Sequence, residues 1–171
     1  MGRWDWSNRD TVEDCKSISV FWLKKQGYLK KDIISTSGGM RWTNSMGDYK
    51  GSIGFIIEMQ EDRGQMRFQY TYTNPSNEEK EELDYFVNLV STSCNYGNRR
   101  WWFICTTTNN GVYCGRRVGK LYLGSGGKFF ACRHCYDLTY QSCKDSHKFD
   151  SIAYEMGITP NLLNRLFKDS K

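Results

Sequence analysis

Hydrophobic and polar residues alternate along the first part of the chain with a period of two. The clearest run is the segment 53–60, in which Ile53, Phe55, Ile57 and Met59 share one face of an extended chain. The same alternation recurs in the runs 40–42, 66–72, 83–89 and 99–105. Short turns rich in Gly, Asn and Asp separate the runs. The pattern therefore predicts an antiparallel β-meander with one buried face over residues 39–105.

A helical period precedes this meander. An apolar stripe with spacings of three and four residues passes through Val12, Cys15, Ile18 and Trp22. Thr11 is a suitable N-cap residue, and Gly27 is a suitable residue to end a helix. We therefore predict an N-terminal helix over about residues 12–26.

The C-terminal segment returns to a helical pattern. Residues 149–167 match a helix-turn-helix, with the small Ala153 between the helices, Gly157 at the turn and Thr159 as the cap of the second helix. The second helix would expose three side chains that can bind base edges. These are Asn161, Asn164 and Arg165. The alternative is an ordinary helical hairpin that docks on the body of the protein.

Four of the seven cysteines form two pairs, Cys105 with Cys114 and Cys132 with Cys135. Zn²⁺ takes about four soft ligands in a tetrahedron, and two cysteines on one turn supply half of that set. The second pair has the short CxxC spacing. The first is wider, but Gly115 after it tolerates the positive φ that a backbone around a metal needs. The spacing predicts one structural Zn²⁺ bound by all four thiolates.

The segment between the two pairs supports this prediction. The runs 118–123 and 128–131 are β-prone, and a glycine-rich turn joins them, so we expect a hairpin with a cysteine pair at each end, as in a zinc ribbon. A disulfide would need an oxidising compartment, and the chain opens without an apolar secretory signal. A redox CxxC would lie at a strand-to-helix turn. Free core thiols remain the other alternative.

The net charge of +5 is unevenly distributed. Residues 94–148 contain nine Lys or Arg against two Asp, so this segment is the basic pole of the chain. A basic surface is typical of proteins that bind phosphate groups, although a merely solvated face uses the same residues. The candidate phosphate contacts are Arg99, Arg100, Arg116, Arg117, Lys120 and Arg133.

Several motifs lie in residues 1–15, 99–105, 110–118, 120–123 and 132–140. They resemble those of an uncharacterised family of small bacterial zinc-ribbon proteins. The resemblance implies a zinc ribbon and no assigned activity. The chain departs from the family pattern at Thr106 and in the long spacing from Cys105 to Cys114, which leaves Cys94 as an alternative to Cys105 as the fourth ligand.

Together these patterns predict an α+β protein with three regions. They are an N-terminal helix plus antiparallel β-meander (1–98), a zinc ribbon continuous with it (99–145), and a helix-turn-helix-like pair (146–171). No apolar run approaches the roughly 18 residues of a membrane span. Seven cysteines without a secretory signal indicate reduced thiols, so we expect a cytoplasmic protein.

The predicted function is that of a zinc-stabilised nucleic-acid-binding protein, accessory or regulatory, of bacterial or phage origin. DNA is favoured over RNA because of the C-terminal pattern. We expect no enzyme, because a Zn²⁺ with four protein ligands has no open position for a substrate. The alternative is a protein-interaction adaptor or inhibitor that docks on a nucleic-acid-processing machine.

Overall fold

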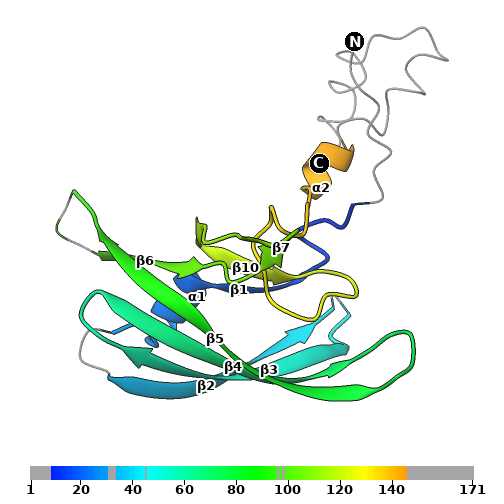
Figure 1. The fold of residues 1–171 in the computed structure, drawn as a ribbon, viewed down its shortest axis with the longest axis horizontal. Coiled ribbons are helices and arrows are strands. Elements are labelled where there is room, and N and C mark those ends of the chain that lie inside the picture. The colour runs from blue at the N-terminus through cyan, green and yellow to red at the C-terminus, as the bar shows by residue number, and fades with distance from the viewer. Residues whose placement is uncertain (1–8, 31–33, 45, 96, 98, 146–171) are drawn as a thin grey trace, which may run out of the picture. The chain divides into compact units, whose positions relative to one another are not determined.

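The structure is a computed structural model that describes residues 9–30, 34–44, 46–95, 97 and 99–145. Within these residues the fold is mainly antiparallel β (Figure 1). Its two helices are short, α1 (Val20–Lys25) and α2 (Gln141–Asp145). The prediction of an α+β class is therefore wrong. Neither helix in the described part of the chain is long and apolar enough to cross a membrane.

A curled six-stranded antiparallel sheet forms the largest element (Figure 1). In sheet order its strands are β2 (Ser35–Thr43), β3 (Tyr49–Met59), β4 (Arg63–Thr73), β5 (Lys80–Ser93), β6 (Arg99–Ile104) and β9 (Arg117–Val118). The first five strands follow one another in the chain and in the sheet. The predicted meander is confirmed, because every alternating run of the sequence lies in one of these strands.

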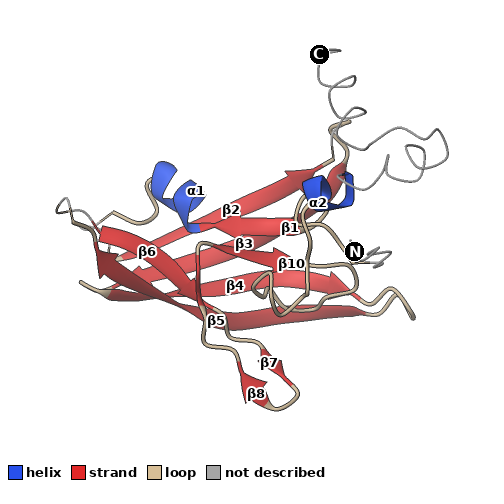
Figure 2. Ribbon diagram, turned by 90° about the horizontal axis from the view of Figure 1, so that it is seen from above, coloured by secondary structure: helices blue, strands red, loops and turns tan. Residues whose placement is uncertain are grey.

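A second, two-stranded layer lies on the concave side of this sheet (Figures 1 and 2). It consists of β1 (Lys16–Ser19) paired antiparallel with β10 (Lys120–Leu123). β9 and β10 are separated only by Gly119, so the chain leaves the large sheet there and enters the second layer. The predicted hairpin is present in shortened form, because Tyr122 forms an antiparallel bridge with Ala131.

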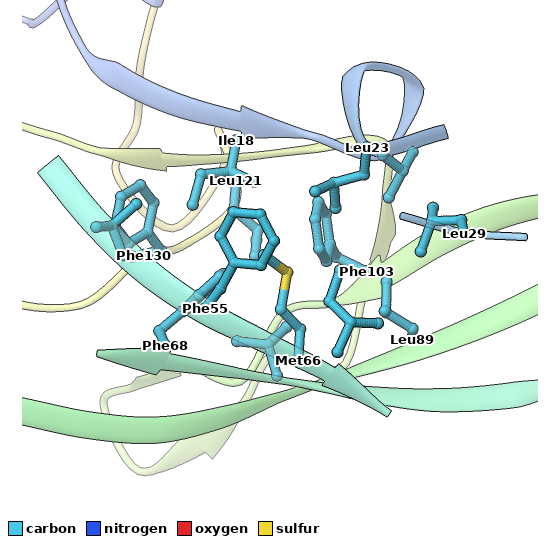
Figure 3. Close-up of a cluster of buried hydrophobic side chains, with 14 of the residues drawn as sticks. Ile18, Leu23, Leu29, Phe55, Met66, Phe68, Leu89, Phe103, Leu121 and Phe130 are labelled. Atoms are coloured by element: carbon cyan, nitrogen blue, oxygen red, sulfur yellow. The ribbon is translucent and has the colours of Figure 1, made fainter. Parts of the chain in front are cut away.

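The main hydrophobic core fills the space between the two layers (Figure 3). Ile18 and Leu121 reach it from the second layer, and Phe55, Phe68 and Phe103 reach it from the large sheet. All five side chains are fully buried. Their burial follows from the period of two, which directs every second residue of a strand toward the same face.

The predicted helix over residues 12–26 is wrong in its first two turns. Residues 12–14 form a turn, in which Asp14 N–H donates to the Thr11 carbonyl, and β1 follows. Only the second half is helical, and it is capped by Ser19, whose Oγ accepts a hydrogen bond from Phe21 N–H. Gly27 follows its C-cap with φ of +85°, as predicted. The apolar stripe did not distinguish a helix from a strand at Ile18. This side chain is fully buried although it lies in β1, which pairs with β10.

The four predicted ligand cysteines belong to a compact unit formed by residues 15–136. The second unit combines the N-terminal segment up to Asp14 with the segment from Asp137 onward. A parallel bridge between Thr11 and Thr139 joins its two chain segments. Arg9 and Asp137 form an ion pair at 3.1 Å between the same two segments. The predicted helix pair over residues 149–167 lies outside the described residues.

Candidate metal centre

The four predicted ligand cysteines lie together. Their Sγ atoms are all within 4.8 Å of one another. The separations are 3.8 Å for Cys105–Cys135, 3.8 Å for Cys114–Cys132 and 3.5 Å for Cys132–Cys135. A tetrahedron with metal–sulfur bonds of about 2.3 Å has edges of about 3.8 Å. A disulfide would bring two sulfurs to about 2.05 Å, so none of these three pairs is a disulfide. The four cysteines form a group that could hold a metal ion.

Cys105 rather than Cys94 belongs to this group. Cys105 is fully buried at the end of β6, where the large sheet carries it to the cluster. Cys94 is exposed, just after the end of β5. The alternative ligand set with Cys94 therefore has no support in the geometry.

A small hairpin explains how Cys105 and Cys114 meet despite their wide spacing. The inserted residues form β7 (Thr108–Asn109) and β8 (Val112–Tyr113), which pair antiparallel. At the base of this hairpin, Cys114 N–H donates to the Thr107 carbonyl at 2.9 Å. Cys114 therefore lies beside Thr107, near the position that the second cysteine of an uninterrupted CxxC turn would take. Figure 2 shows the hairpin projecting away from the sheet.

The residue after each pair completes its turn. Gly115 has φ of +59°, and its N–H donates to the Cys105 carbonyl at 3.1 Å, so the predicted need for a glycine is confirmed. On the second turn, Cys135 N–H and Tyr136 N–H both donate to the Cys132 carbonyl, at 3.0 and 3.3 Å. The two turns also contact each other, because Cys132 N–H donates to Cys105 Sγ at 3.3 Å.

Tyrosine hydroxyls hold the chain that leads into the second turn. Tyr70 Oη donates to the Lys128 carbonyl at 2.5 Å, and Tyr136 Oη donates to the Phe129 carbonyl at 2.5 Å. Tyr85 Oη accepts a hydrogen bond from Phe130 N–H at 2.9 Å. Tyr70 and Tyr85 belong to β4 and β5, so the large sheet positions the residues just before Cys132.

The electrostatic environment differs among the thiols. Burial raises the pKa of the Cys132 thiol. Burial and the neighbouring thiols together raise the pKa of Cys135. Burial would also raise the pKa of Cys105, but hydrogen bonds to its sulfur from the Thr107 and Cys132 backbone, and from the Thr107 and Cys135 side chains, together lower this pKa below its ordinary value. A bound metal cation would allow these buried thiols to be deprotonated together, because cysteines bind a metal as thiolates and release their protons when they do so.

The predicted basic residues have different environments. Arg99 forms an ion pair with Asp62 and also donates to the Glu61 carbonyl, so its charge is neutralised. The Arg100 guanidinium lies against the rings of Phe21 and Trp102. The side chains of Arg116, Arg117 and Lys120 are exposed, and Arg133 is half-buried beside the cluster. The three predicted base contacts, Asn161, Asn164 and Arg165, lie outside the described residues.

Two features of the site were not predicted. The contacts of Tyr70 and Tyr85 join residues 58 and 45 positions apart in the chain, so no local pattern reveals them. The contact of the Arg100 guanidinium with the Phe21 ring joins residues even farther apart in sequence. The one available signal was that basic and aromatic residues adjoin in the run 99–103.

Comparison of the chain with protein-family models, with curated proteins and with solved structures gives no match. The function is therefore inferred from the residues of the site. The resemblance to small bacterial zinc-ribbon proteins stays a prediction.

Proposed function

We propose that the protein is a non-enzymatic nucleic-acid-binding protein whose four-cysteine group holds a structural Zn²⁺. The observation that carries the metal part is the separation of the sulfurs, at 3.5–3.8 Å for three of the pairs. Four thiolates in a tetrahedron favour Zn²⁺ or an iron–sulfur centre. A single ion accounts for the compact group, because one ion with bonds of about 2.3 Å requires these edges.

A structural role follows from the number of ligands. Four protein ligands complete the tetrahedron, whereas a catalytic Zn²⁺ keeps a position for water or substrate. The ion would join the turn after β6 to the turn before Tyr136. It would thereby hold residues 105–135 against the large sheet.

The nucleic-acid part rests on the exposed cations next to these turns. Arg116 and Arg117 directly follow the first turn, and Lys120 begins β10. Among the described residues none of the three forms an ion pair, and all are exposed. Unpaired cations held on a rigid scaffold are what a phosphate backbone requires.

The test is a titration of labelled DNA and RNA oligonucleotides with the purified full-length protein at low salt. The variant Arg116→Ala with Arg117→Ala should weaken binding to all sequences alike. Its slope of log K against log salt should flatten by roughly 0.7–0.9 for each lost phosphate contact.

The matched control is Lys50→Ala with Lys80→Ala, which removes two exposed charges from β3 and from the end of β5 that does not pair with β6. It should bind as the wild type does. Equal losses in both variants would mean that only net charge matters. No binding of wild type to any oligonucleotide would contradict the proposal and favour the protein-interaction adaptor.

A further inference from the structure

Three chain segments that meet at the β6–β9 end of the large sheet contain no acidic residue. The segments are 16–26, 99–104 and 115–123, and they carry eight Lys or Arg without one Asp or Glu. β1 pairs with β10, β6 pairs with β9, and α1 contacts β6, so the three segments are neighbours in space. Arg99 is neutralised by Asp62 from a turn, which leaves seven cations.

Aromatic rings lie among these cations. The Arg100 guanidinium carbon lies 4.2 Å from the ring centroid of Trp102 and 5.3 Å from that of Phe21. Trp102 is held in place, since its Nε1–H donates to Thr92 Oγ1 at 2.9 Å. Phe21 is 51% exposed although it is a large apolar side chain. Its ring therefore offers a stacking surface to a ligand.

The backbone at Gly119 makes room for this arrangement. A Cβ atom at Gly119 would lie 3.0 Å from the Phe21 ring, which is closer than nearly all real contacts of that kind. Val20 N–H donates to the Gly119 carbonyl at 3.0 Å, which ties α1 to the bend between β9 and β10. The hydrogen bond to Gly119 and the absence of a side chain there therefore fix the position of the exposed Phe21 ring.

Two exposed cations lie on strands next to the segments that carry the rings. Arg117 is the register partner of Ile104, which lies on the same face of β6 as Arg100 and Trp102. Lys120 is the register partner of Ser19, two residues before Phe21. Exposed cations near an exposed ring suit a ligand that carries a charged backbone and flat unpaired groups.

We propose that this aromatic-basic edge, formed by Phe21, Arg100, Trp102, Arg117 and Lys120, binds single-stranded nucleic acid. A base stacks on the Phe21 ring or the Arg100 guanidinium plane, and Arg117 and Lys120 bind the neighbouring phosphates. A duplex keeps its bases stacked inside and gains nothing from exposed rings. The inference rests on the proposed function and adds the ligand class and its place.

The experiment measures the fluorescence anisotropy of labelled ten-residue oligothymidine and oligouridine, and of a labelled 20-base-pair duplex, with the full-length protein. Both single strands should bind more tightly than the duplex. Phe21→Ala should weaken single-strand binding about tenfold or more, as the loss of one base–aromatic stack does. Phe21→Leu, which keeps an apolar side chain beside Gly119, should lose the same stack and guards against a folding artefact.

The matched control is Phe129→Ala. Phe129 is 45% exposed, with the Lys128 ammonium 5.5 Å from its ring centroid, but Glu81 neutralises that lysine. This control should bind single strands as the wild type does. If duplex binds as tightly as single strand and both Phe21 variants bind normally, the inference fails and the proposed function stands. If no oligonucleotide binds, both fail.

Discussion

Two regions of the same compact unit are held together by different physical means. Among the residues that the structure describes, the main core buries fifteen apolar residues between two β layers, whereas the cluster around the cysteines buries Cys105, Ala131 and Cys132. Burial of apolar surface contributes roughly 25 cal/mol per Å². The main core can therefore stabilise itself, but the small cluster buries too little to do so. A bound metal would therefore provide at residues 105–135 the stability that apolar packing provides in the main core.

The largest expected effect comes from removing a thiol of the cluster. Cys135→Ser should lose the metal and destabilise the protein by about 4–5 kcal/mol or more, since metal loss is among the most costly changes. Metal analysis and calorimetry of the purified variant measure both effects. Cys94→Ser is the matched control, because Cys94 is exposed and outside the group, and it should keep the metal. If Cys135→Ser kept the metal and Cys94→Ser lost it, the metal would not be bound by the group Cys105, Cys114, Cys132 and Cys135.

The next effect belongs to the apolar core. Phe68→Ala should cost about 3–5 kcal/mol, because Phe68 is fully buried and its removal leaves a cavity. The metal content of the folded fraction should not change. Urea unfolding followed by circular dichroism measures the loss, with Phe86→Ala, half-exposed on the other face of the sheet, as the control. A loss of metal in the folded Phe68→Ala protein would contradict the separation of the two regions.

A smaller effect is expected where the two regions meet. Tyr85→Phe should cost about 1–3 kcal/mol, because it leaves the buried Phe130 N–H without an acceptor. Burial also raises the pKa of Tyr85 and of Tyr70 in the folded protein. These hydroxyls ionise near pH 10 in the unfolded chain and only at higher pH in the folded protein. The free energy of unfolding therefore has its full value below pH 10 and falls as the pH rises above it.

Thermal melts between pH 8 and 11 test this sign. The wild type should lose stability above about pH 10, and Tyr85→Phe should lose less over the same interval. Stability that is independent of pH in this interval, or identical slopes in the two proteins, would refute the role given to the tyrosine contacts.

The smallest effect is expected from the inserted hairpin. Excision of residues 108–113 should keep the metal and change stability by about 1 kcal/mol or less, since Cys114 already lies beside Thr107. Deleting Thr106 and Thr107 instead removes fewer residues but shortens the turn itself, and should lose the metal. Metal analysis of the two deletion variants compares them directly. Loss of metal in the first variant would show that the hairpin shapes the site.

The sequence predicts the two regions unequally well. The strands of the meander were predictable because period-two alternation is local, as in the run Ile53–Met59. The cysteine group was predictable because ligands at the ends of short turns have a characteristic spacing. The helix over residues 12–26 was not, since Ile18 fits either period and the pairing of β1 with β10 decides between them.

The charge pattern was the least informative about individual residues. Arg99 and Arg100 are adjacent in sequence, yet one is neutralised by Asp62 and the other lies between two rings. These partners lie 37 and 79 residues away from them in the chain, at Asp62 and Phe21. No local pattern distinguishes such neighbours, because the sheet pairing sets their surroundings.

The most direct test of the metal centre is X-ray absorption at the zinc edge of the purified full-length protein. One Zn²⁺ per chain with four sulfur ligands at about 2.3 Å is the expected result. A first shell that contains nitrogen or oxygen, or protein that folds fully without bound zinc, would contradict a structural four-cysteine site.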